Sequence, residues 1–267
     1  MTTGQVPVDV ACAGWPTVPA CGRNEMSTTV RDRLGAVTGA AFVVLILVGN
    51  QMATAGSGQS ARPTGDQVLR DAAHQVSSAS VAAGVALEVL GFAAFIVFLG
   101  YLADVLRRGA AGRHGSIAAG TGIVSGAVMV AVKLGSAVPI MVLWVDHSTI
   151  SPQLALVLND LGGVAFVISW LPSAIFVAAA AAALHRVGLV GRPTAYCGFV
   201  LGAAGLVLTI IGIHDPFSAN PLAFLLGLLW LLAVSARLAI RPGTGASAGQ
   251  ASGRADARVA VSASATP

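Results

Sequence analysis

The sequence predicts an all-α fold, a polytopic transmembrane bundle of six helices, from three observations. Only 10% of the 267 residues are charged and 55% are hydrophobic, whereas a soluble domain carries about 25% charged residues. The mean hydropathy of the chain is +0.81. The apolar residues fall in runs that are long enough to cross a bilayer, separated by polar or arginine-rich turns.

The six predicted spans each come close to or exceed the roughly 20 residues that a helix needs to cross a membrane. They cover residues 34–53, 81–106, 117–144, 153–184, 195–213 and 222–240. Residues 1–33 and 242–267 lack apolar runs, so we predict disordered cytoplasmic segments on both sides of the 34–241 bundle. For the N-terminal segment, Met26 as the true start is an alternative.

The flanks of the first span resemble those of a secretory signal peptide. Arg31 and Arg33 precede the span, and Ala53-Thr54-Ala55 follows it. However, the apolar core is longer than the roughly 7 to 15 residues of a signal-peptide core. We therefore predict a span that is retained rather than cleaved.

The connection 54–79 is the longest polar segment between two spans. Within it, Thr64 and Gln67 have the spacing of a capping box, which predicts the start of a helix. Apolar residues then recur at helical spacing from Val68 to Val76. This pattern predicts a short amphipathic helix on the membrane surface.

Glycines and prolines predict how the spans pack and bend. Three spans contain a Gly-x-x-x-Gly pair, which lets helices approach closely; the pairs are Gly35/Gly39, Gly122/Gly126 and Gly198/Gly202. In a multi-span protein such pairs predict packing within the chain rather than dimerisation. Pro139 predicts a kink in the third span, and Pro172 lies in the middle of the fourth.

The distribution of arginine predicts the orientation. Twelve of the 14 arginines fall in the N-terminal region, the second and fourth connections and the C-terminal tail. By the positive-inside rule, both termini face the cytoplasm of a multi-pass plasma-membrane protein. The sequence pI near 9.5 does not indicate nucleic-acid binding, because the arginines lie beside membrane segments. The expected partner is the lipid bilayer, together with an unidentified small molecule or protein.

The polar residues within the spans gather in the extracytoplasmic half. Lys133, the only lysine, lies about 24 Å along the third span from the cytoplasm, and Glu88 and Asp160 lie about 10 Å below the outer surface. Ionised groups that face lipid are costly, so we expect these three to face the interior and to pair. Asn159, Asn50 and Gln51 complete a predicted buried polar cluster, a candidate ligand or proton site.

Three interpretations of Lys133 stay open. Its long side chain could snorkel to the outer interface. It could form a structural ion pair that fixes the register of the helices. It could bind a ligand or take part in transport, since intramembrane ionisable residues mark such sites.

The sequence contains no pattern typical of a metal or catalytic site. His74, Asp146, His147, His214 and Asp215 are expected on the outer side, and His147, His214 and Asp215 would be the candidate zinc ligands. Their spacing fits no HExxH-type motif, and the three cysteines form no CxxC pair. No P-loop, GxSxG or dinucleotide fingerprint occurs. We therefore predict no metal, no cofactor and no catalytic residues.

Several short motifs resemble a family of uncharacterised actinobacterial six-span integral membrane proteins. They are Phe98-Leu99-Gly100-Tyr101-Leu102, Leu106-Arg107-Arg108, Asn159-Asp160-Leu161-Gly162, Leu171-Pro172-Ser173-Ala174 and Gly-Leu-Val-Gly-Arg-Pro at 188–193. The resemblance extends from about Arg31 to Arg241. It implies a six-span membrane protein and assigns no function or site residues.

The leading functional prediction is a non-enzymatic integral membrane protein with a polar pocket in its extracytoplasmic half. A small proton-coupled carrier is one alternative, although the two halves show no inverted repeat. A structural or accessory subunit is another. A membrane-embedded, metal-dependent hydrolase is the third, and it would need the outer histidines and aspartates.

Overall fold

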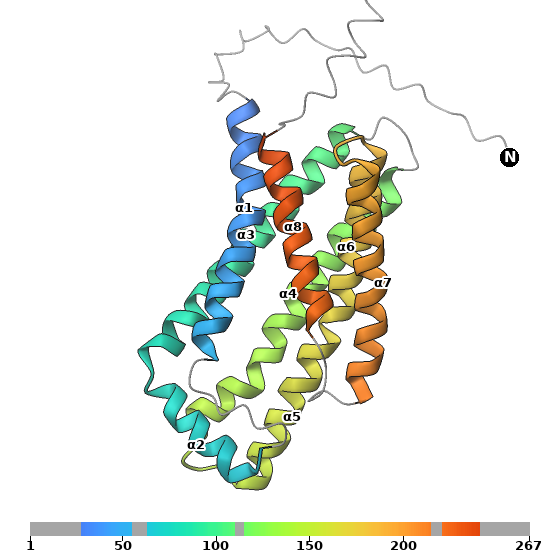
Figure 1. Cartoon of the computed structure of the whole chain (residues 1–267). Coiled ribbons are helices and arrows are strands. Elements are labelled where there is room, and N and C mark those ends of the chain that lie inside the picture. The colour runs from blue at the N-terminus through green and yellow to red at the C-terminus, as the bar shows by residue number, and fades with distance from the viewer. Residues whose placement is uncertain (1–27, 55–62, 110–114, 215–220, 241–267) are drawn as a thin grey trace, which may run out of the picture.

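The computed structural model describes residues 28–54, 63–109, 115–214 and 221–240, and these residues form an all-helical bundle without strands. In chain order the helices are α1 Thr28–Ala53, α2 Gly65–Val76, α3 Ala79–Gly109, α4 Gly115–Asp146, α5 Pro152–Ile168, α6 Trp170–Arg186, α7 Arg192–His214 and α8 Leu222–Ile240. Figure 1 shows the long helices running lengthwise beside one another, with α2 lying across one end of the bundle.

The described helices provide six candidate membrane spans, which confirms the predicted fold class. Five spans are the single helices α1, α3, α4, α7 and α8, and the remaining span, Pro152–Arg186, combines α5 and α6. Helix α1 begins at Thr28, so it includes residues 28–33, which the sequence analysis assigned to the N-terminal segment. The disorder predicted for residues 1–27 and 242–267 falls outside the described residues.

Helix α2 is the amphipathic helix predicted in the first long connection. Its capping box is formed: the Gln67 amide donates to Thr64 Oγ1 at 3.4 Å, and the Thr64 amide donates to Gln67 Oε1 at 2.7 Å. Val68 and Ala72 are buried in a small apolar cluster with residues of α4 and α5. The helix is therefore held against the end of the bundle by its apolar face, and its position on a membrane surface remains a prediction.

The span from Pro152 to Arg186 is broken between α5 and α6 at Ser169. Pro172 has no amide hydrogen for the Ile168 carbonyl, and its ring crowds that carbonyl, which explains the break. Ser169 is fully buried, and its hydroxyl donates to the Phe166 carbonyl at 2.5 Å. Helix α4, in contrast, continues through Pro139 as one helix.

The Gly-x-x-x-Gly pairs pack against other helices of the same chain, as predicted. A methyl group at Gly39 would lie 2.6 Å from the Phe98 ring of α3. One at Gly202 of α7 would lie 2.8 Å from Ala178 Cβ of α6, and one at Gly126 of α4 would meet α3. Glycine is required at these positions because the helices approach too closely for a side chain.

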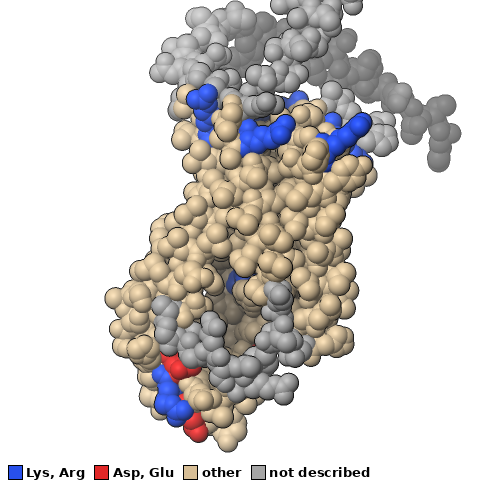
Figure 2. All heavy atoms as spheres, viewed as in Figure 1, with Lys and Arg blue, Asp and Glu red and all other residues tan. Residues whose placement is uncertain are grey.

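The two ends of the molecule differ in their charged residues. Figure 2 shows basic residues gathered at the end of the bundle where α1 begins and α8 ends. There, Arg108 at the end of α3 donates to both carboxylate oxygens of Asp32 in α1, at 2.8 and 3.3 Å. Asp32 is only 7% exposed. This ion pair fixes the ends of two neighbouring spans relative to each other.

Candidate functional site

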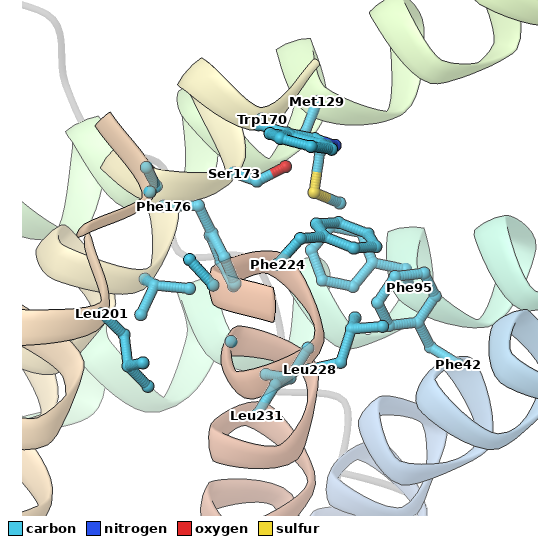
Figure 3. Close-up of a pocket in the computed structure, with 15 residues that line it drawn as sticks. Phe42, Phe95, Met129, Trp170, Ser173, Phe176, Leu201, Phe224, Leu228 and Leu231 are labelled. Atoms are coloured by element: carbon cyan, nitrogen blue, oxygen red, sulfur yellow. The ribbon is translucent and has the colours of Figure 1, made fainter. Parts of the chain in front are cut away.

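A cavity that is partly open to the outside lies between the helices of the bundle. Six helices contribute side chains to it: α1, α3, α4, α6, α7 and α8. Its larger lining side chains are Phe42, Phe95, Met129, Trp170, Phe176 and Phe224 (Figure 3). The cavity is therefore bounded mainly by aromatic and aliphatic surface.

Two features of the sequence create this cavity. Small residues line it on three adjacent helices, among them Ala174 of α6, Gly205 of α7 and Ala223 of α8. The break at Ser169 starts α6 at Trp170, which also lines the cavity. Small side chains leave space that the neighbouring aromatic rings do not fill.

The aromatic rings around the cavity contact one another across helices. The Phe42 and Phe95 ring centroids are 4.5 Å apart, and Phe95 meets Phe176 edge to face at 5.3 Å. Edge-to-face and tilted ring pairs of this kind stabilise an apolar core by more free energy than the burial of their surface area alone provides. The cavity walls on the α1, α3 and α6 sides therefore belong to the most tightly packed part of the bundle.

Lys133 borders the cavity through two aromatic contacts. Its Nζ lies 3.2 Å from the centroid of the Phe166 ring and 5.4 Å from that of Phe224, which lines the cavity. In the part of the chain that the structure describes, no carboxylate oxygen lies within 4.0 Å of Nζ, and Nζ donates no hydrogen bond. Figure 2 shows a hollow in the half of the bundle away from the arginine-rich end, with a basic side chain visible inside it.

Trp170 provides a second polar group at the cavity. Its side chain is 4% exposed, and among the described residues its Nε1 has no hydrogen-bond partner. The ring also meets Phe166 edge to face, at a centroid distance of 5.8 Å. Phe166 is therefore a shared neighbour of the Lys133 ammonium and the Trp170 indole. A buried N–H without an acceptor is rare and costly in a folded protein.

The predicted ion pairing of Lys133 with Glu88 and Asp160 is not formed. Glu88 of α3 packs against Gly49 of α1; it is within electrostatic range of Lys133 but not in contact with it. Asp160 Oδ1 is buried and has no hydrogen-bond partner among the described residues. Among the described residues, the three charged groups therefore do not form the predicted ion pairs.

The remaining predicted polar residues do not line the cavity either. Asn50 and Gln51 are exposed at the end of α1, and Asn159 is partly exposed on α5. The Asn50 carbonyl accepts a hydrogen bond from the Thr54 hydroxyl at 2.7 Å. None of the six residues in the predicted cluster is among those that line the cavity; Lys133 lies beside it, against the ring of the lining residue Phe224.

The candidate metal ligands are separate where the structure describes them. His147 Nδ1 lies 2.9 Å from the Trp144 carbonyl, which identifies it as the donor of that hydrogen bond. His214 is exposed at the end of α7, and Asp215 lies outside the described residues. Among the described residues, no group of three or more His, Cys, Asp or Glu side chains could hold a metal ion.

Sequence reasoning missed Phe166 as the neighbour of Lys133 and Trp170 as a residue that lines the cavity. The two aromatic residues are four positions apart and lie just before Pro172. The signal in the sequence was a proline with two aromatic residues shortly before it. A proline can break a helix, and the break changes the direction in which the side chains next to it point. The Asp32–Arg108 pair was also missed, although both residues flank spans on the same predicted side of the membrane.

Comparisons with protein-family models, with curated proteins and with solved structures find no match for this chain.

Proposed function

We propose that this integral membrane protein binds a small molecule with an apolar body in the cavity between its helices. The cavity itself carries this proposal. Typical small-molecule sites are concave and mostly apolar, with a few polar groups that orient the ligand. This cavity likewise has mostly aromatic and aliphatic walls; the unpaired Trp170 Nε1 belongs to a lining residue, and Lys133 lies beside the lining residue Phe224.

We further propose that the arginine-rich end faces the cytoplasm of a plasma-membrane protein. The gathering of basic residues at one end of the bundle supports this orientation (Figure 2). The cavity-lining residues Ala223 and Phe224, in the first turn of α8, would then lie in the extracytoplasmic half. A cysteine at the exposed Thr149 position, in a chain without other cysteines, should react with an impermeant maleimide in intact cells. Reaction only after permeabilisation would reverse the orientation.

A carrier function is the second candidate, and the break at Ser169 favours it. Interrupted helices are tolerated in membranes where they are buried in protein or line a cavity, and many transporters bind their substrates beside such breaks. Here the residue after the break, Trp170, lines the cavity. Ligand flux into proteoliposomes would separate a carrier from a protein that only binds.

The binding proposal is tested by filling the cavity. Ala223 lines it from the first turn of α8 and is 8% exposed, so Ala223→Phe places a ring in the space. Ala233→Phe is the matched control, because it adds the same ring on the exposed face of the same helix. We expect native mass spectrometry of protein extracted from membranes to detect a bound small molecule on the wild type and the control, and much less on Ala223→Phe.

Equal occupancy of the three proteins would contradict the proposal, because the bound molecule would then lie elsewhere. A melting temperature close to that of the wild type would show that Ala223→Phe still folds.

A further inference from the structure

We propose that the molecule bound in the cavity is a single-chain amphiphile with a carboxylate head group, held at Lys133. This inference rests on the proposed binding function and adds the chemical class of the ligand. Its apolar chain would occupy the aromatic cavity, and its carboxylate would lie beside the Lys133 ammonium.

The first step is that Lys133 has a charge without a counter-ion in contact. Its Nζ faces the Phe166 and Phe224 rings, and among the described residues it forms no ion pair. An ammonium inside a membrane protein normally pairs with an anion or a carbonyl. The aromatic faces stabilise the cation, but they leave its hydrogen-bonding capacity unused. A ligand anion would supply the missing acceptor.

The second step is that both unpaired polar groups beside the cavity are donors. Lys133 offers ammonium hydrogens, and Trp170 Nε1 offers a buried N–H. Both residues contact the Phe166 ring. A ligand head group composed of acceptors is therefore favoured over an amine or an alcohol, and a carboxylate is such a group.

The third step concerns the number of charges. No lysine or arginine is among the residues that line the cavity, and the one lysine of the sequence, Lys133, lies beside it against Phe224. Phosphate groups, with more charge and more oxygens, are typically held by several donors or by the bidentate fork of arginine. One ammonium beside a deep apolar cavity matches one negative charge on an apolar chain.

The experiment compares two photoactivatable probes of equal chain length, an alkyl carboxylate and the corresponding alkyl alcohol. The full chain is labelled in nanodiscs of zwitterionic lipid, and the modified residues are mapped by mass spectrometry. We expect labelling of cavity residues such as Phe224, with the carboxylate roughly tenfold more efficient, as a charged hydrogen bond would give.

Variants separate the head-group site from the cavity. Lys133→Met should abolish the preference for the carboxylate and leave labelling by the alcohol intact, whereas Lys133→Arg should keep the preference. Arg70→Met removes an exposed cation at the same end of the molecule and should leave the labelling efficiency of both probes unchanged. Ala223→Phe should reduce labelling by both.

Each contrary result has a distinct meaning. Equal labelling by both probes, or a carboxylate preference that survives Lys133→Met, overturns the carboxylate assignment and leaves the binding function standing. A matching alkyl phosphate that labels more strongly than the carboxylate overturns it as well. If neither probe labels the cavity and Ala223→Phe has no effect, the proposed binding function fails, and this inference fails with it.

Discussion

Two charged sites in this bundle are built in opposite ways. At the arginine-rich end, Asp32 of α1 accepts two hydrogen bonds from Arg108 of α3, and Arg108 also pairs with Asp104 at 3.2 Å. Beside the cavity, Lys133 faces the Phe166 ring, and no described carboxylate lies within 4.0 Å of its ammonium. The first charge is neutralised within the protein, and the second is not.

This difference indicates different roles. A buried carboxylate that accepts two charge-assisted hydrogen bonds from the neighbouring helix is held by interactions within the fold. Lys133 forms one strong contact with a ring, and the fold supplies no anion to match its charge. Because an unpaired intramembrane charge is costly, its presence is better explained by binding than by stability. The comparison therefore predicts that the two sites respond differently when the cation is removed.

The largest effect is expected at the paired site. Arg108→Met leaves Asp32 buried without a partner, since the Asp32 side chain is only 10% exposed. Loss of the two hydrogen bonds should lower the free energy of unfolding by about 1–3 kcal/mol. The value stays well below that of a fully buried pair because the Arg108 side chain is 46% exposed and screened by water. Denaturation by SDS in mixed micelles measures the change.

Arg107→Met is the matched control, because Arg107 is the exposed neighbour of Arg108 and forms no ion pair with any carboxylate of the described residues. It should change stability by less than about 0.5 kcal/mol, as surface substitutions usually do. Equal losses in the two variants would show that the arginine-rich end is stabilised by total charge rather than by the Asp32 pair.

A smaller effect, of the opposite sign, is expected at the cavity. Lys133→Met keeps a long apolar side chain and removes a charge that costs about 2.5–3.5 kcal/mol at the centre of a membrane helix. Part of that gain is offset by the lost contact with Phe166, about 0.5–2 kcal/mol, and by the lost attraction to Glu88. We expect stability to stay unchanged or to rise by up to about 1 kcal/mol.

The same SDS titration checks this prediction in protein from which bound molecules have been removed. Lys133→Arg is the companion variant, since it keeps the charge. If Lys133→Met lost stability to the same extent as Arg108→Met, Lys133 would be a structural residue, and the contrast between the two sites would disappear.

The fold was predictable because a bilayer imposes strict requirements on sequence. Lipid offers no hydrogen bonds to the backbone, so spans must be helical and apolar, and hydropathy locates them. The capping box of Thr64 and Gln67 identified α2 for a similarly local reason. The break at Ser169 was not predicted, because Pro139 and Pro172 look alike in a run of apolar residues. The structure also shows the same serine bond before each proline, from the Ser169 hydroxyl to the Phe166 carbonyl and from the Ser136 hydroxyl to the Lys133 carbonyl, yet of the two helices only the one at Pro172 is broken.

The candidate site was predictable only in part. The cost of an isolated ammonium singled out Lys133 as a residue that requires an explanation, and the rise per residue predicts its depth. Its neighbours could not be predicted, because sequence does not give the rotation of one helix against another. Glu88 therefore packs against Gly49 rather than pairing with Lys133, and an aromatic ring, Phe166, lies next to the ammonium.

The smallest expected effect tests whether Lys133 is held by an aromatic ring rather than by an anion. Phe166→Leu and Lys133→Met, measured singly and together by SDS titration, should show a coupling free energy of about 0.5–2 kcal/mol. Phe224→Leu should couple to Lys133 more weakly, because its ring centroid is 5.4 Å from Nζ, against 3.2 Å for Phe166. Additive effects within about 0.3 kcal/mol would mean that the ring does not stabilise the ammonium. Lys133 would then need an anionic partner within the chain, and the two charged sites would be built alike.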